Sequence, residues 1–284
     1  MGLKKILLFM GLACLLAQLF FSGAAAKDGS ATLNLIIRME ESSLAGGKNQ
    51  AEKQNQEMNS TINLLNAVDS KNLDVTISVT GDMAYKLYPL YVTMLGSKKN
   101  HELIMSGMKS GEELASFEDQ DSRMRKTKRY VEDDYICGGT QIKVAGYLPA
   151  ENSFNDSTYK IIDDLGLSYM VDDSGLAQSQ DKAWPYLMDG HSFYVVPASA
   201  GPNFRMWDVL ANSAGLNGTD WYDLLVSTFD ESSAKGDPMV AVFTNTVSGS
   251  GEYLDAYKKF VEYAVSKGAS FVTTGQLVDT AKSK

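Results

Sequence analysis

Two groups of polar residues follow apolar runs of the chain and are of types that carry chemistry. The run Leu33–Met39 reaches the acids Glu40 and Glu41, and the run Leu103–Met105 is followed by segment 106–110, which begins and ends with serine. Carboxylates at the end of a buried strand act as bases or metal ligands, whereas serine hydroxyls bind zinc poorly. Neighbouring strand residues point to opposite faces, so at most one glutamate faces a cleft. The pair is either a retained acidic site for sugar hydroxyls or two solvated loop acids.

A second acidic pair and the two histidines are further candidates. Asp172 and Asp173 end the run Leu167–Val171, so they either share a cleft with the glutamates or form a strand-exit turn with an Asx cap. His101 and His191 lack the spacing of a ligand pair, so hydrogen bonds to neighbouring groups are expected for both. His101 begins a predicted strand, at the opposite end from the acids. No Gly-x-Ser-x-Gly segment surrounds the serines, so serine hydrolysis is not expected.

Aromatic and basic side chains suggest two binding surfaces. Sugar rings stack on aromatic planes, and five aromatic residues fall in predicted loops, where they line a carbohydrate cleft or pack in the core. They are Trp184, Tyr186, Trp207, Trp221 and Tyr222. A basic run in a predicted helix is either a polyanion site or, as the nearby acids favour, a solvated helix face. It comprises Arg123, Arg125, Lys126, Lys128 and Arg129.

Apolar runs rich in β-branched residues alternate with amphipathic stretches, which predicts a single-domain α/β protein with a mostly parallel sheet. The expected strands are Leu33–Met39, Val75–Thr80, Leu103–Met105, Ile142–Tyr147, Leu167–Val171, Phe193–Val196, Met239–Thr244 and Ser270–Thr273. Helical stripes cover Met58–Val68, a short helix capped by Ser157 and stopped by Gly166, and a long helix stopped by Gly268. Segment 42–56 is expected to be a loop. Periodicity alone does not separate an open sheet from a barrel.

The N-terminus has the pattern of a secretory signal. Lys4 and Lys5 precede the apolar run Ile6–Phe21, and three alanines end at residue 26, so we expect residues 1–26 to be removed and residues 27–284 to form the mature domain. The alternative is an uncleaved membrane anchor. Loss of two lysines leaves 24 basic and 35 acidic residues, a formal charge of −11, which disfavours nucleic acid and anionic membranes as partners. Only Cys137 remains after cleavage, so no internal disulfide is possible.

The order of these motifs, from about Leu33 to Val278, resembles the polysaccharide deacetylase family in its nodulation-protein-B homology form. The resemblance implies a deformed (β/α) barrel. In that family a T-F-D-D-G motif supplies a base and a metal-binding aspartate, and H-x-x-x-H supplies two further metal ligands. An arginine motif orients the base, and a histidine on a late strand acts as the acid. The metal polarises an acetamide carbonyl and activates water.

The resemblance implies roles for several positions, and most catalytic groups are replaced. Glu40 stands at the base position and Glu41 at the metal-binding position, whereas Ser106 and Ser110 stand where the two histidine ligands are expected. Leu148 occupies the arginine position, and the late histidine falls on Thr244 or Asn245. The residues implied as substrate contacts are Tyr147, Pro149, Asp172, Asp173 and Asn245.

The sequence therefore predicts an exported pseudoenzyme that engages carbohydrate of the cell envelope or the extracellular space. We expect no resident cofactor, no nucleic acid partner, and membrane contact only through an uncleaved signal segment. One alternative is a metal-dependent carbohydrate deacetylase or hydrolase rebuilt on oxygen ligands from Glu41, Asp172 or Asp173, which would favour calcium, magnesium or manganese. Another is a surface scaffold that uses the barrel for neither sugar nor metal.

Overall fold

The computed structural model describes residues 31–41, 50–87, 89–110, 115–132, 142–150 and 154–284. Residues 31–284 form one compact unit. The predicted signal segment and Cys137 lie outside the described residues. Within the described ranges, no helix has the length and apolar character needed to cross a membrane.

Strands and helices alternate along the unit, as the apolar runs predict. The strands are β1 (Thr32–Arg38), β2 (Val75–Val79), β3 (His101–Met105), β4 (Gly146–Tyr147), β5 (Tyr169–Asp172), β6 (Tyr186–Leu187), β7 (Tyr194–Pro197), β8 (Met239–Thr244) and β9 (Ser270–Phe271). The α-helices are α2 (Gln50–Asp69), α3 (Pro89–Gly96), α4 (Phe117–Glu132), α5 (Asp156–Asp164), α6 (Asp208–Ser213), α7 (Gly218–Lys235), α8 (Asn245–Ser248), α9 (Gly251–Ser266) and α10 (Thr274–Lys282). Two short turns are the π-helix η1 (Met83–Leu87) and the 3-10 helix η3 (Ala177–Ser179).

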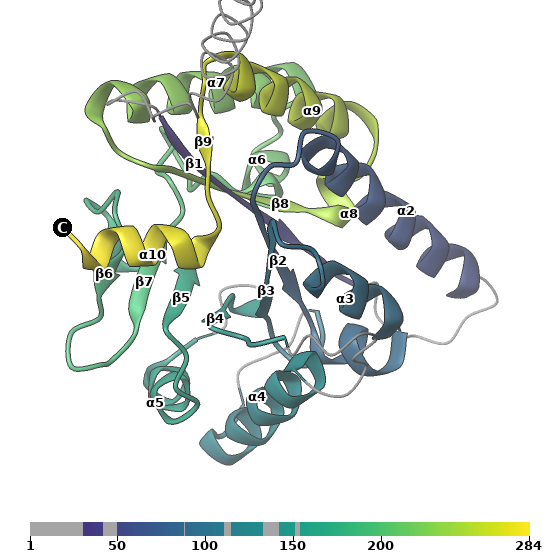
Figure 1. The fold of residues 1–284 in the computed structure, drawn as a ribbon, viewed down its shortest axis with the longest axis vertical. Helices are drawn as coiled ribbons and strands as arrows, with labels where there is room; N and C mark the ends of the chain where they lie inside the picture. The colour runs from purple at the N-terminus through teal and green to yellow at the C-terminus, as the bar shows by residue number, and fades with distance from the viewer. Residues whose placement is uncertain (1–30, 42–49, 88, 111–114, 133–141, 151–153) are drawn as a thin grey trace, which may run out of the picture. The chain divides into compact units, whose positions relative to one another are not determined.

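The strands form a curled sheet in the order β6-β7-β5-β4-β3-β2-β1-β8, with β9 also beside β1 (Figure 1). Every pair in this sheet is parallel except β6 with β7. The chain after β7 meets β8, because the N–H of Ser199 donates to Val240 O at 2.9 Å and the N–H of Val242 donates to Met206 O at 2.8 Å. Irregular backbone thus joins the two ends of the sheet, which confirms the predicted deformed barrel.

Alternation along the strands separates two cores. In β1, Leu33, Leu35 and Ile37 belong to the core between the sheet and the helices. Ile36, between them, belongs to a second cluster with residues of β3, β5, β7 and β8. Because the side-chain period of a strand is two, Arg38 continues the inner row, and it is 1 % exposed. The strands therefore bring inward-pointing polar side chains together at their carboxyl ends. We call this end of the barrel the mouth.

Eight predicted strands are present, and the main corrections concern their limits and the caps. The strand predicted over Ile142–Tyr147 shortens to Gly146–Tyr147, and β6 was not predicted because two residues give no periodic signal. Helix α2 begins at Gln50, inside the predicted loop. Helix α5 is capped by Asn155, which forms a capping box with Thr158, so the predicted Ser157 cap is wrong. Gly166 and Gly268 follow helices with φ of 63° and 74°, as expected of stop signals.

Candidate functional site

Glu41 and Ser110 lie in direct contact at the mouth. The Ser110 N–H donates to Glu41 Oε1 at 2.7 Å, and the Ser110 hydroxyl donates to Oε2 at 3.0 Å. The hydroxyl of Thr80, one residue after β2, donates to Oε2 at 2.9 Å. Two of the three positions that the resemblance assigns to metal ligands are therefore joined by hydrogen bonds between their own groups.

The Glu41 carboxyl is largely removed from water, with the residue 5 % exposed. Burial raises the pKa of this carboxyl, while its bonds to Ser110 and Thr80 act in the opposite direction. These three donors satisfy both oxygens, which explains how an acid can be stable in this position. The other serine, Ser106, is 2 % exposed, and its N–H donates to Val79 O at 2.8 Å.

Arg38 is the buried cation of the mouth, and the sequence analysis gave it no role. Its Nη1 lies 3.0 Å from Asp173 Oδ2, and its Nε lies 3.0 Å from Glu40 Oε1. The Trp207 ring lies under the guanidinium, with 5.1 Å between the guanidinium carbon and the ring centroid. An arginine inside an apolar run was the available signal, because a buried arginine requires acidic partners.

Two carboxyl groups around Arg38 are fully buried. Burial raises the pKa of Asp173 to about 6. The charge of Arg38 lowers this pKa and the charge of Asp172 raises it, but burial is the largest effect. Asp208, which begins α6, accepts from the Thr244 N–H at 2.7 Å and the Ser248 hydroxyl at 2.6 Å, and burial raises its pKa to about 7. Within the described part of the chain, Oδ1 of Asp173 and Oδ1 of Asp208 have no hydrogen-bond partner.

Asn245, predicted as a substrate contact, binds the backbone of Glu40. The Glu40 N–H donates to Asn245 Oδ1 at 2.9 Å, and Asn245 Nδ2 donates to Glu40 O at 3.1 Å and to the Thr61 hydroxyl at 3.2 Å. The two implied contacts of the arginine motif, Tyr147 and Pro149, are buried. Asn245 therefore fixes the end of β1 to α8 and α2.

Asp172 and Asp173 differ in role: one forms the strand-exit turn and the other lies in the mouth. Asp172 is the turn residue: its oxygens accept from the backbone N–H groups of Ser174, Gly175 and Leu176 and from two serine hydroxyls. Asp173 lies in the mouth with Arg38. Only the second aspartate reaches the acids at the end of β1.

Comparison with known proteins gives a result at the level of structure. No protein-family model matches the sequence, and no curated protein matches it. A crystal structure from Pseudomonas aeruginosa PAO1, classed as a polysaccharide deacetylase, has a TM-score of 0.70 and 15% identity, covering 89% of this chain and 91% of that chain. One of the same class from Mycobacterium smegmatis has a TM-score of 0.68 and 15% identity, covering 92% and 93%.

The chain has the polysaccharide deacetylase fold. A further structure with this fold is a CE4 family pseudoenzyme from Bacillus anthracis, with a TM-score of 0.55 and 12% identity over 89% of this chain and 66% of that chain. The deacetylase fold therefore occurs in enzymes and in a pseudoenzyme. Whether a protein with this fold is catalytic depends on the side chains at its mouth.

The side chains of this deacetylase fold do not fit a zinc ion at the mouth. Zinc takes nitrogen, sulfur or carboxylate donors, and a catalytic site supplies three of them. Here the ligand positions hold Glu41, Ser106 and Ser110, and hydrogen bonds occupy both oxygens of the only carboxylate among them. Among the described residues, no group of three His, Cys, Asp or Glu side chains is placed to hold a metal ion. A rebuilt site that uses Glu41, Asp172 or Asp173 would have to displace the hydrogen bonds of Glu41 or Asp172, or to compete with Arg38 for Asp173.

Both histidines bind acidic neighbours, and two of the five candidate aromatic residues are buried. His101 contacts Asp69 at 2.7 Å from the start of β3, and His191 contacts Asp163 at 2.7 Å, so both have neighbouring partners as predicted. The loop placement predicted for Trp221 and Tyr222 is wrong, because both belong to α7. Trp207 and Trp221 are buried, at 4 % and 0 %, since each packs an apolar ring into the core.

Proposed function

We propose that this protein is an exported, catalytically inactive relative of the polysaccharide deacetylases that engages carbohydrate. The contact between Glu41 and Ser110 carries the proposal. It joins two positions at which active relatives are expected to hold their metal, and a cation at Glu41 would have to compete with these hydrogen bonds for the carboxylate oxygens.

The electrostatics of the mouth support the same conclusion. Metal-dependent hydrolysis needs a Lewis acid with an open position, which supplies several kcal/mol to the transition state. In this chain the positive charge beside Glu40 and Asp173 is the guanidinium of Arg38, which is 1 % exposed and offers no open coordination position. The likeness to a CE4 pseudoenzyme provides a precedent for the fold without catalysis.

Carbohydrate engagement is proposed from the fold. The similar structures are classed as polysaccharide deacetylases, and binding a polymer does not require the metal that hydrolysis requires. Export is proposed from the N-terminal pattern of the sequence.

Calorimetry on the purified, chelator-treated protein tests the loss of catalysis. We expect no binding of zinc, manganese, calcium or magnesium at millimolar concentration, and no acetate release from N-acetylglucosamine oligomers when these ions are added. Tight stoichiometric binding that disappears in Glu41→Gln would contradict the proposal and favour the rebuilt metal site.

Secretion and sugar binding need separate measurements. The full chain, expressed in a secretion-competent host, is expected outside the cytoplasm with a new N-terminus near Lys27, as read by mass spectrometry. The purified protein is expected to bind at least one class of polysaccharide in an affinity gel. Retention of the protein by none of a panel of neutral and acidic polysaccharides would favour the scaffold alternative.

A further inference from the structure

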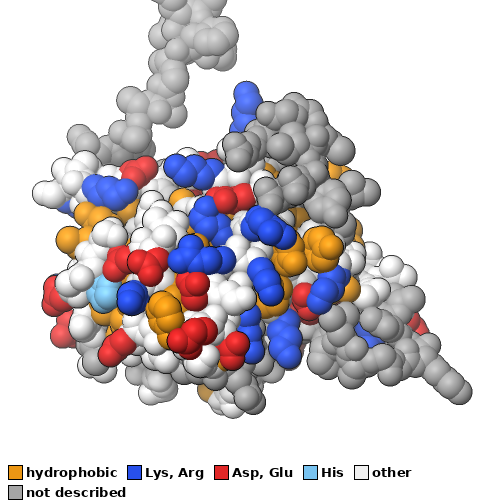
Figure 2. Space-filling view, turned by 90° about the horizontal axis from the view of Figure 1, so that it is seen from below, with side chains coloured by type: hydrophobic (Ala, Val, Ile, Leu, Met, Phe, Trp, Pro, Cys, Tyr) orange, Lys and Arg blue, Asp and Glu red, His pale blue; other side chains and the backbone are white. Residues whose placement is uncertain are grey.

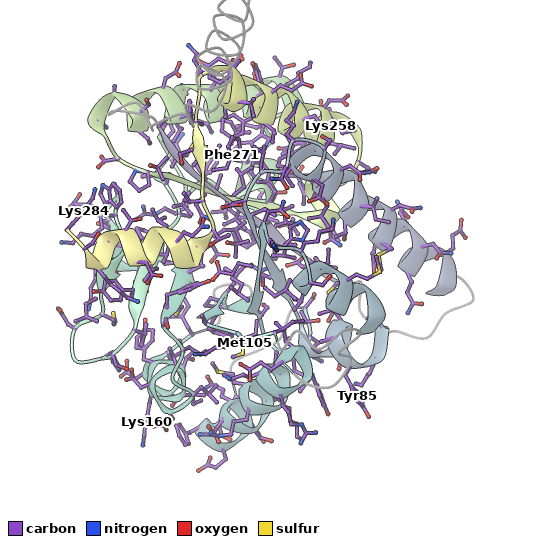
Figure 3. The ribbon with its side chains drawn as sticks, viewed as in Figure 1. Tyr85, Met105, Lys160, Lys258, Phe271 and Lys284 are labelled. Atoms are coloured by element: carbon purple, nitrogen blue, oxygen red, sulfur yellow. The ribbon has the colours of Figure 1, made fainter. Side chains whose placement is uncertain are left out.

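An aromatic stack joins an exposed tyrosine, Tyr85, to Tyr130, which is partly buried against the core. Tyr85, in η1, stacks on Tyr130, in α4, with ring centroids 4.4 Å apart and planes inclined by 11°. Tyr85 is 50 % exposed, and Figure 3 shows it on the outer side of its helical turn. Because Tyr130 covers one face of the Tyr85 ring, the opposite face is the surface that a ligand can reach.

Cationic side chains surround this stack. Lys86 follows Tyr85, its side chain is 54 % exposed, and its Nζ lies 2.8 Å from Asp82 Oδ1. The guanidinium carbon of Arg129 lies 5.5 Å from the Tyr130 ring centroid. Lys126 is exposed one helical turn before Tyr130, on the same side of α4. Figure 2 views the side of the molecule that carries α4 and shows lysine and arginine side chains gathered over the middle of that face.

The stack adjoins the mouth. Turn η1 starts three residues after Thr80, whose hydroxyl binds Glu41. The hydrogen bond to Asp82 raises the pKa of Lys86, and the charges of Asp82, Tyr130 and Glu41 add smaller increases.

We propose that Tyr85, Tyr130 and Lys86 form a binding surface for an anionic glycan, in which a sugar ring stacks on Tyr85 and a carboxylate or phosphate substituent pairs with Lys86, Lys126 or Arg129. The inference rests on the proposed carbohydrate function and specifies the class of ligand. Aromatic faces attract the C–H face of a pyranose, and exposed lysines add charge-assisted hydrogen bonds to an acidic substituent.

The test compares binding of a uronic acid polymer, polygalacturonate, with binding of a neutral N-acetylglucosamine oligomer. We expect Tyr85→Ala to weaken binding of polygalacturonate roughly tenfold, through the lost stacking contact. Tyr85→Trp, which keeps an aromatic face, should retain it. Lys86→Met should weaken binding of the acidic polymer several-fold and leave binding of the neutral oligomer unchanged. It should also reduce the salt dependence of polygalacturonate binding, because an ion pair that salt screens is removed.

Two matched controls use residues elsewhere. Tyr263→Ala removes a partly exposed tyrosine from α9, and Lys258→Met removes an exposed lysine from the same helix (Figure 3). Neither should change binding of polygalacturonate, and urea unfolding establishes that each variant is folded.

The outcomes separate this inference from the proposed function. Binding of polygalacturonate that is equal in wild type and Tyr85→Ala would overturn the surface and leave carbohydrate binding intact. Preference for the neutral oligomer would overturn the anionic class. Equally tight binding of a single-stranded oligonucleotide would overturn the glycan assignment in favour of a general polyanion surface. Failure to bind any polysaccharide would instead contradict the proposed function itself.

Discussion

Arg38 Nη1 lies 3.0 Å from Asp173 Oδ2, and the two side chains are 2 % and 1 % exposed. The residues are 135 positions apart in the chain and come from the carboxyl ends of β1 and β5. Their ion pair spans the mouth above the apolar interior of the barrel, with the Trp207 ring beneath the guanidinium. The guanidinium of Arg38 therefore places a positive charge of the protein itself inside the mouth.

Arg38→Met tests the energetic role of this pair. Removing one partner of a buried ion pair leaves the other charge uncompensated, so we expect the free energy of unfolding at pH 7 to fall by about 3–5 kcal/mol. Urea unfolding measures the loss. The double variant Arg38→Met with Asp173→Asn should recover part of it, because no buried charge is left behind.

The exposed pair Arg125 and Asp121, whose Nε and Oδ2 are 2.9 Å apart on α4, supplies the control. Arg125→Met should cost no more than about 1 kcal/mol. Equal losses for Arg38→Met and Arg125→Met would show that the buried pair has no special role.

Glu41→Ala tests the hydrogen bonds at the buried Glu41 carboxylate. The variant leaves the Ser110 N–H and the Thr80 hydroxyl without their acceptor, and we expect a loss of about 1–3 kcal/mol in the free energy of unfolding. Glu52→Ala, in the exposed first turn of α2, should change stability by less than about 0.5 kcal/mol. A Glu41→Ala protein as stable as Glu52→Ala would contradict the structural role of Glu41.

Asp208 should make stability depend on pH. Burial raises its pKa to about 7, whereas an unfolded aspartate titrates near 4. Between these values the folded protein keeps a proton that the unfolded chain releases, so the free energy of unfolding falls as the pH rises from about 4 to about 7. The fall attributable to this group is on the order of 4 kcal/mol.

Asp208→Asn, which resembles the protonated acid, isolates this contribution. Urea unfolding of variant and wild type should give similar stability near pH 4 and a growing advantage for the variant up to about pH 8. Parallel pH profiles for the two proteins would mean that Asp208 ionises in the folded state without a penalty.

Restoring family ligands should restore metal binding. We expect the triple variant Glu41→Asp, Ser106→His and Ser110→His to bind zinc in the micromolar range or tighter, because it supplies one carboxylate and two imidazoles. Calorimetry measures the gain over wild type. The matched variant with Glu41→Ala in place of Glu41→Asp should bind at least tenfold more weakly, and equal binding by the two would place the metal elsewhere.

The order of the longer strands was accessible from the sequence, and helix α7, the caps, the limits of β4 and the strand β6 were not. Long apolar strands such as β1 and β8 are buried on both faces, which gives continuous runs that are easily recognised. Strand β4 and strand β6 have two residues each, too few for periodicity. Asn155 and Ser157 are both suitable caps, and only the backbone conformation at Asn155 decides between them.

The sequence by itself determined the parallel α/β architecture and the presence of serine at positions 106 and 110, because apolar patterns and residue identities are local properties. Tertiary structure decided which polar groups meet. Only folding brings Ser110 to Glu41, across 69 positions, and Arg38 to Asp173. It also decided that Trp207 and Trp221 are buried while Tyr85 is exposed, because the exposure of an aromatic ring depends on the elements packed around it.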